Sequence, residues 1–69
     1  MKNDTIAIEI YNNAIKQCFY LNIDASKENI KKICENNIFF LKMQFQYIDP
    51  EDKVILNFYD EVLSKILLL

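Results

Sequence analysis

This 69-residue sequence contains no glycine, no histidine, no arginine and no tryptophan, and it has one proline. Without glycine there is no loop that cradles phosphate and no dinucleotide-binding fingerprint. Without histidine, the commonest general base and a frequent metal ligand are missing. Without arginine, no side chain offers the planar fork that holds phosphate or guanine through two hydrogen bonds. We therefore expect no enzymatic activity, no cofactor and no metal.

The serines and cysteines do not form a reactive site in the sequence. Ser26 and Ser64 have no general base beside them, and Cys18 and Cys34 lie on apolar helix stripes where a thiolate is disfavoured. In an antiparallel helix pair, the two cysteines would lie beyond the roughly 7 Å that a disulfide allows between α carbons. We expect two buried, reduced thiols, as is usual in a cytoplasmic protein.

The net charge is −2, from 8 lysines and 10 acidic residues, which is too small to indicate a nucleic-acid partner. The charge is unevenly spread along the chain. Residues 27–42 carry four lysines and two glutamates, a local +2, whereas residues 49–65 carry five acids and two lysines, a local −3. We expect these two regions to complement each other within the fold.

No feature of the sequence indicates a membrane protein. The first five residues lack the apolar core of a signal peptide, and no apolar run approaches the roughly 20 residues that span a bilayer. We expect a cytoplasmic location. The preference for Ile, Asn, Lys, Phe and Tyr indicates an AT-rich genome, such as that of a low-GC bacterium or its phages.

Apolar residues recur with the period of an α-helix in three segments, so the predicted fold class is all-α. The expected helices cover about residues 4–21, 26–47 and 50–68 of a single domain, 1–69. Similar helix lengths and short turns favour an up-down-up antiparallel three-helix bundle. The expected N-caps are Asn3, Asp4 or Thr5 for the first helix, Asp24 or Ser26 for the second, and Asp49 for the third, with Pro50 in its first helical position.

The second segment contains a heptad seam with two polar members. The seam consists of Ile30, Cys34, Asn37, Leu41, Gln44 and Ile48. Asn37 and Gln44 are one heptad apart and have two interpretations. They are polar residues tolerated at the edge of a bundle, or they pair across an interface and fix register or oligomeric state, as a buried asparagine does in coiled coils.

A second apolar stripe lies beside this seam and consists of Phe39, Phe40, Met43 and Tyr47. It is either core of the monomer or a surface for self-association or a protein partner, since methionine and aromatic residues are enriched at such surfaces. Hydrophobic residues make up 52% of the chain, and a chain of this size buries only about 60% of its surface. We therefore expect a homo-oligomer, at least a dimer. The acidic edge around Asp60 and Glu61 is an alternative partner surface.

Two short patterns resemble known families. Asp24-Ala25-Ser26 and Ile30-Lys31-Lys32, with Leu41-Lys42 and Val62-Leu63-Ser64, resemble the J-domain of heat-shock co-chaperones. The His-Pro-Asp tripeptide of that family is absent, and Tyr47-Ile48-Asp49-Pro50 stands in its place. Separately, Asp4, Ile8-Glu9, Tyr11 and Ala14 resemble the first helix of the small sporulation kinase inhibitors.

The small size and the missing catalytic motifs predict a non-enzymatic protein-binding module. We expect an inhibitor or accessory regulator, of the type carried by phages and mobile elements, that occupies a surface of a larger protein. The alternative is a structural subunit whose role is oligomerisation. A helix-turn-helix DNA-binding protein is disfavoured by the net acidity and the lack of arginine.

Overall fold

Three α-helices form almost the whole chain in the computed structural model, which describes residues 2–69 and the side chains of residues 3–69. They are α1 (Lys2–Tyr20), α2 (Lys27–Ile48) and α3 (Lys53–Leu67). Each helix packs against both of the others, and residues 2–69 contain no β-strand. The predicted all-α three-helix bundle is therefore confirmed.

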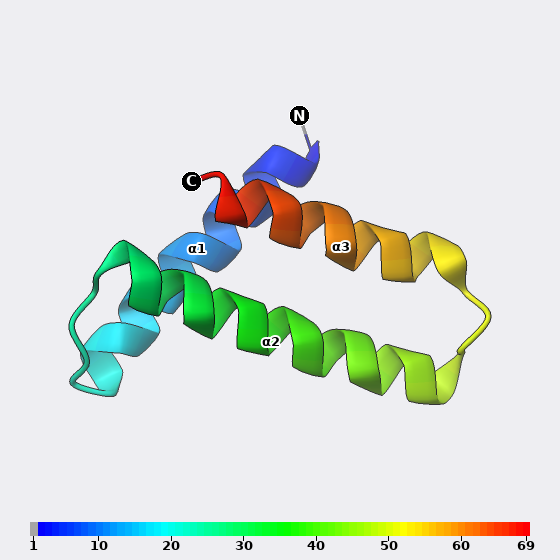
Figure 1. Cartoon of the computed structure of the whole chain (residues 1–69), viewed down its shortest axis with the longest axis horizontal. Coiled ribbons are helices and arrows are strands. Elements are labelled where there is room, and N and C mark those ends of the chain that lie inside the picture. Colours follow the sequence, from blue (N-terminus) through cyan, green and yellow to red (C-terminus); the bar gives the residue numbers. More distant parts are fainter. Residues whose placement is uncertain (1) are drawn as a thin grey trace.

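The helices do not all run along one direction. Figure 1 shows α2 and α3 side by side and antiparallel, whereas α1 crosses obliquely behind them. The chain is correspondingly flat, with Cα extents of 38 × 26 × 14 Å. The α2–α3 hairpin agrees with the predicted antiparallel order, but the crossing of α1 means that a regular up-down-up row is not confirmed.

Small and medium-sized side chains form the core at this crossing. The buried residues of α1 are Ala7, Ala14 and Cys18, and small residues let helix backbones approach closely. None of the aromatic side chains among residues 3–69 is buried. The remaining buried hydrophobic residues are Ile30, Cys34, Ile38, Leu56, Val62 and Ile66.

Both cysteines lie in this core as free thiols with no solvent exposure, which confirms their predicted burial without a disulfide. The Cys34 thiol lies 3.9 Å from the carbonyl oxygen of Ile10, so it joins α2 to α1. Burial raises the pKa of Cys34, because removal from water disfavours the thiolate. This thiol is therefore a packing element of the core.

The end of α1 has the geometry for which helices usually use glycine. Asn22 adopts a left-handed conformation with φ of 59°. The N–H of Ile23 donates to the carbonyl of Cys18 at 2.9 Å, and the N–H of Asn22 donates to that of Phe19 at 3.2 Å. This is a Schellman motif, in which asparagine is the usual substitute for glycine.

The start of α2 confirms one of the two predicted caps. Ser26 is the N-cap, and its hydroxyl oxygen accepts a hydrogen bond from the backbone N–H of Asn29 at 3.2 Å. The other candidate, Asp24, supports the same residue differently. Its backbone carbonyl accepts a hydrogen bond from the side-chain amide of Asn29 at 2.9 Å. Both contacts fix the chain direction as it enters α2.

The predicted cap of the third helix is wrong. Asp49 ends α2 instead, since its N–H donates to the carbonyl of Phe45 at 2.8 Å. The N-cap of α3 is Asp52, whose carboxylate accepts from the N–H groups of Val54 and Ile55 at 3.1 and 3.2 Å. The reason is spatial: α2 continues through Ile48, and reversal into an antiparallel helix needs a loop of several residues.

The predicted caps of the first helix are also wrong, because α1 begins at Lys2 and therefore includes Asn3, Asp4 and Thr5. The Asp4 carboxylate instead accepts a hydrogen bond from Lys65 Nζ at 2.7 Å, which joins α1 to α3. A second ion pair, Lys42–Asp60 at 2.6 Å, joins α2 to α3. It connects the basic and acidic regions, so the expected charge complementarity is present at this point.

We predict that Asp52→Ala lowers the free energy of unfolding by about 1 kcal/mol, because two N–H groups of α3 lose their acceptor. Asp49→Ala is the matched control and should change stability much less, since the observed bond of Asp49 uses its backbone. Urea denaturation followed by circular dichroism measures both values. A larger effect at Asp49 than at Asp52 would contradict the observed start of α3.

We also predict a pH dependence from the Asp4–Lys65 pair. The hydrogen bond from Lys65 holds the pKa of Asp4 below its ordinary value, and the same bond raises the pKa of Lys65. The folded chain therefore binds the Asp4 proton more weakly than the unfolded chain does. The contribution of Asp4 to stability is present above the ordinary carboxyl pKa and is lost as the pH falls through the lowered value.

An NMR titration of the Asp4 carboxyl group tests this expectation. In Lys65→Met the pKa of Asp4 should move up toward its ordinary value, whereas Lys53→Met, which changes an exposed lysine at the start of α3, should leave it unchanged. An unshifted Asp4 in the native chain would show that the ion pair does not persist in solution.

Candidate interaction surface

The stripe predicted beside the seam of α2 lies on the surface of the molecule. Phe39, Phe40, Met43 and Tyr47 are 63%, 61%, 53% and 91% exposed. Of the two interpretations of these side chains, packing in the core of a single chain is therefore excluded. Their role as an interface remains a proposal.

These side chains lie on the side of α2 opposite the bundle core. The buried residues Ile30, Cys34 and Ile38 follow one another at intervals of four on the inner side. On the outer side, Asn36, Phe40, Met43 and Tyr47 are spaced by four, three and four residues, which is the spacing of a coiled-coil seam. We call these four residues together with Phe39 the outer stripe.

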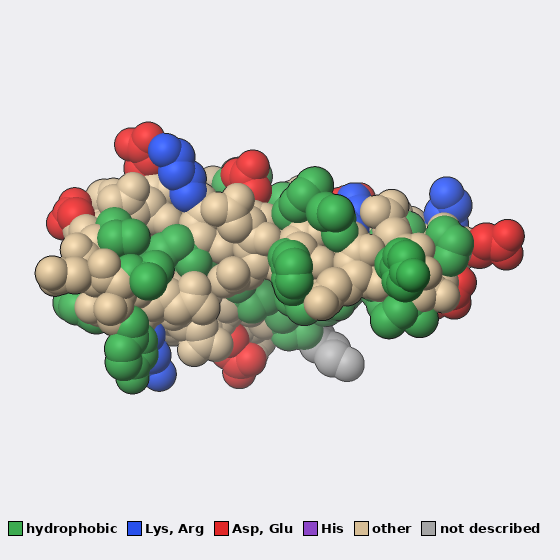
Figure 2. Space-filling model, turned by 90° about the horizontal axis from the view of Figure 1, so that it is seen from below, with side chains coloured by type: hydrophobic (Ala, Val, Ile, Leu, Met, Phe, Trp, Pro, Cys, Tyr) green, Lys and Arg blue, Asp and Glu red, His purple; other side chains and the backbone are tan. Residues whose placement is uncertain are grey.

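The outer stripe carries no charge. Lys42 is the one charged residue between Asn36 and Ile48, and its ammonium group is held 2.6 Å from the carboxylate of Asp60 on α3. Figure 2 shows hydrophobic side chains along this side of the molecule, separated mainly by backbone and uncharged side chains, which share one colour. Charged side chains stand mainly toward the margins of the same view.

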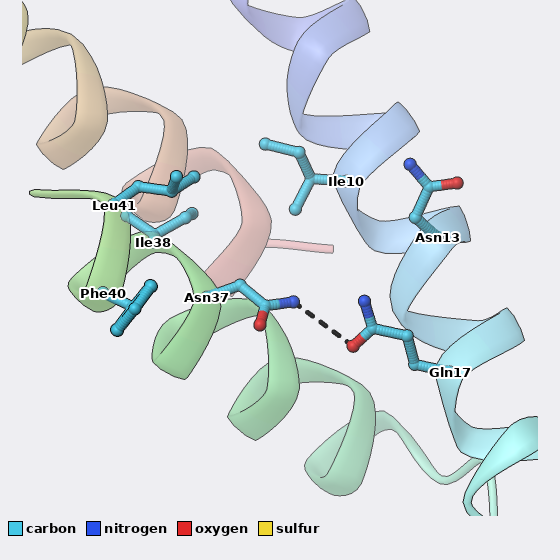
Figure 3. A pocket seen from close by; sticks show the side chains of 7 residues that line it. All are labelled: Ile10, Asn13, Gln17, Asn37, Ile38, Phe40 and Leu41. Atoms are coloured by element: carbon cyan, nitrogen blue, oxygen red, sulfur yellow. Dashed lines mark hydrogen bonds between the residues drawn. The ribbon is translucent and has the colours of Figure 1, made fainter. Parts of the chain in front are cut away.

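The seam predicted for α2 is buried only at Ile30 and Cys34, since its apolar members Leu41 and Ile48 are 44% and 78% exposed. Asn37 and Gln44 are both exposed, and Asn37 donates from its side-chain amide to Gln17 Oε1 of α1 at 3.3 Å (Figure 3). A heptad seam needs supercoiled helices, because an ordinary α-helix has 3.6 residues per turn. Since α1 crosses α2 obliquely, the buried row follows the four-residue interval from Cys34 to Ile38. Asn37 therefore joins two helices of one chain.

A groove of about 350 Å³ lies between α1 and α2 next to Phe40 of the outer stripe. In Figure 3 the amides of Asn37 and Gln17 reach toward each other across it, and Ile10 points from α1 toward α2. None of its lining side chains is acidic or basic, so it offers apolar contact and amide hydrogen bonds. The lining residues are Ile10, Asn13, Gln17, Asn37, Ile38, Phe40 and Leu41.

The acidic edge is separate from the outer stripe. Asp60 and Glu61 are exposed on α3, and Asp60 is already engaged by Lys42 at the contact between α2 and α3. The two predicted partner surfaces therefore lie on different helices, which the Lys42–Asp60 pair joins. Glu61 is the other residue of the acidic edge and directly follows Asp60 in the sequence.

A second group of exposed apolar side chains was not predicted from the sequence. Phe19, Tyr20, Leu21 and Ile23 surround the Schellman turn after α1 and lie in solvent. The apolar periodicity placed both Cys18 and Phe19 on the apolar half of the helix. The position at which α2 crosses α1 determines that Cys18 is buried and Phe19 is exposed. Such a contact depends on residues far apart in the sequence.

No protein-family model, curated protein or solved structure matches this chain. The resemblances to J-domains and to sporulation kinase inhibitors therefore rest on short motifs alone. Within residues 2–69, no helix has the length and hydropathy needed to cross a membrane. Over the same part of the chain, His, Cys, Asp and Glu side chains do not gather in groups of three or more that could hold a metal ion.

We predict that Phe39→Ser combined with Met43→Ser leaves the helical fold intact at low micromolar concentration, because both side chains are more than half exposed. The adjacent residue Ile38 is only 2% exposed and provides a matched control. Ile38→Ala should lower the free energy of unfolding by about 2–5 kcal/mol. Thermal melts followed by circular dichroism compare the two, and unfolding of the Phe39/Met43 variant would place the stripe in the core.

Proposed function

We propose that this chain is a non-catalytic protein-binding module and that the outer stripe of α2 is its contact surface. The observation that carries the proposal is the exposure of three aromatic side chains and a methionine on one uncharged helix face. Aromatic side chains have about 150–250 Å² each, so the exposed parts of Phe39, Phe40 and Tyr47 amount to roughly 400 Å². An area of this size equals the largest apolar patch of a typical monomer, about 300–600 Å², and such a patch is often functional.

The module would act as an inhibitor or accessory regulator by occupying a surface of a larger protein. A helix that presents apolar residues at intervals of three and four fits the apolar groove of a partner. Aromatic side chains are frequent anchors in such contacts. The skewed residue usage supports an origin in a phage or mobile element of a low-GC host.

A second candidate function is that of a structural subunit that only oligomerises. The uncharged character of the outer stripe favours it, because two copies of an uncharged face meet without electrostatic repulsion. In this case the partner of the chain is the chain itself, and no other protein is regulated.

Affinity capture from the native host, with three forms of the tagged chain, tests the proposal. We expect the native chain to retain a foreign protein in stoichiometric amount and Phe40→Ser with Tyr47→Ser to lose it. Val54→Ser is the matched control, since Val54 is an apolar residue of α3 that is 77% exposed. It should retain the foreign protein.

The other outcomes are equally informative. Capture of copies of this chain alone would favour the oligomerisation subunit. Retention of the foreign protein by the Phe40/Tyr47 variant would show that the contact lies elsewhere, and loss upon Glu61→Gln would then place it at the acidic edge of α3.

A further inference from the structure

We infer that the outer stripe of α2 binds a second copy of this chain, with the two α2 helices antiparallel across a twofold axis that passes between Phe40 and Met43. The inference rests on the proposed function, since it uses the same surface, for which a second copy and the larger partner protein would compete. It goes further because it specifies the occupant, the direction of the helices and the register.

The register follows from the symmetry of the seam. The positions of Asn36, Phe40, Met43 and Tyr47 are symmetric about a point midway between residues 41 and 42. A reversed copy therefore matches the original, with Phe40 opposite Met43 of the second copy and Asn36 opposite Tyr47 of the second copy. Methionine sulfur packs favourably against aromatic rings, and an amide can pair with a phenol hydroxyl. Because a twofold axis relates the two copies, each of these contacts occurs twice in the dimer.

Charges at the two ends of the stripe favour the antiparallel direction. Lys32 precedes the stripe by one helical turn and has a side chain that is 70% exposed, and Glu51 is exposed in the turn after α2. The antiparallel register brings the end of α2 that carries Lys32 to the end of the second copy's α2 that is followed by the acidic turn, residues 49–52. A parallel pair would instead bring the acidic turn, residues 49–52, against the same turn of the other copy, where like charges repel.

Lys32 can take part in this contact because its present partner holds it weakly. Its ammonium group lies 3.6 Å from the carboxylate of Glu28 one turn earlier, and both side chains are largely exposed. Ion pairs of this kind contribute little to stability and exchange readily. The stripe between the charged ends has no charge of its own that would have to lose water when two copies meet.

The available apolar area is sufficient for such a contact. Burial of the exposed parts of Phe39, Phe40, Met43 and Tyr47 in both copies removes roughly 1,000 Å² of surface from water. This is near the lower limit for specific protein interfaces, which is about 1,000–1,200 Å² in total. We therefore expect a reversible dimer that dissociates on dilution.

Cysteine cross-linking tests the direction and register in the folded chain. The native cysteines have no solvent exposure, so they should stay unreactive under mild oxidation. An equimolar mixture of Asn36→Cys and Tyr47→Cys should give a disulfide-linked dimer of twice 8.2 kDa. Each variant alone should stay uncoupled. In the antiparallel register, residue 36 of one copy is offset from residue 36 of the other by eleven residues, about 16 Å along the helix axis, and the same holds for residue 47, which is well beyond disulfide range.

A third variant, Glu9→Cys, changes an exposed residue of α1 outside the stripe and should not cross-link with either. Cross-linking of Asn36→Cys with itself and of Tyr47→Cys with itself would show a parallel pair and overturn the inference. Equal coupling of Glu9→Cys would show that the contacts are random collisions, which also overturns it.

Analytical ultracentrifugation of the native chain separates this inference from the proposed function. The mass should be twice 8.2 kDa and should fall to 8.2 kDa in Phe40→Ser with Met43→Ser, while circular dichroism remains helical. A native chain that is monomeric up to about millimolar concentration, where dimers of about 4 kcal/mol form, overturns the inference. The proposed function would still stand if stripe variants lose the captured foreign protein.

Discussion

The oblique crossing of α1 over the α2–α3 hairpin depends on small side chains at the contact. Ala7, Ala14 and Cys18 bring the backbone of α1 close to its neighbours, and Cys34 meets the backbone carbonyl of Ile10 at the same level. A close contact of this kind leaves no volume for aromatic rings. The aromatic side chains therefore lie at the edge of the core or on the surface. Three of them, Phe39, Phe40 and Tyr47, lie on the exposed face of α2.

The connections between the helices keep this arrangement in place without glycine. Asn22 takes the left-handed position that ends α1, and the side chains of Ser26 and Asp52 satisfy the N–H groups that begin α2 and α3. Two ion pairs then join distant parts of the chain, one between α1 and α3 and one between α2 and α3. Since Lys42 is held by Asp60, the part of α2 that carries the outer stripe, residues 36–48, presents no other charged side chain.

The packing of α2 against α1 and α3 therefore determines both which of its residues enter the core and which form the outer stripe. The inner side of α2 satisfies the single chain, whereas the outer side repeats a coiled-coil spacing that nothing in the single chain covers. The order of residues on this outer face is symmetric about its midpoint, and the proposed antiparallel pairing of two copies rests on that symmetry. The groove beside Phe40 widens the same surface toward α1 and adds amide groups at its edge.

The sequence by itself determined the fold class, the approximate extents of the three helices and the burial of both cysteines, and it narrowed the cap of α2 to Asp24 or Ser26, because these features depend on local periodicity and local hydrogen bonds. It also grouped Phe39, Phe40, Met43 and Tyr47 on one face. Only the tertiary structure decided that this face is exposed, that Asn37 contacts Gln17 and that α3 begins after Asp52. These features depend on the angle at which α1 crosses α2 and on the space needed to reverse the chain, and neither is encoded in the period of a single helix.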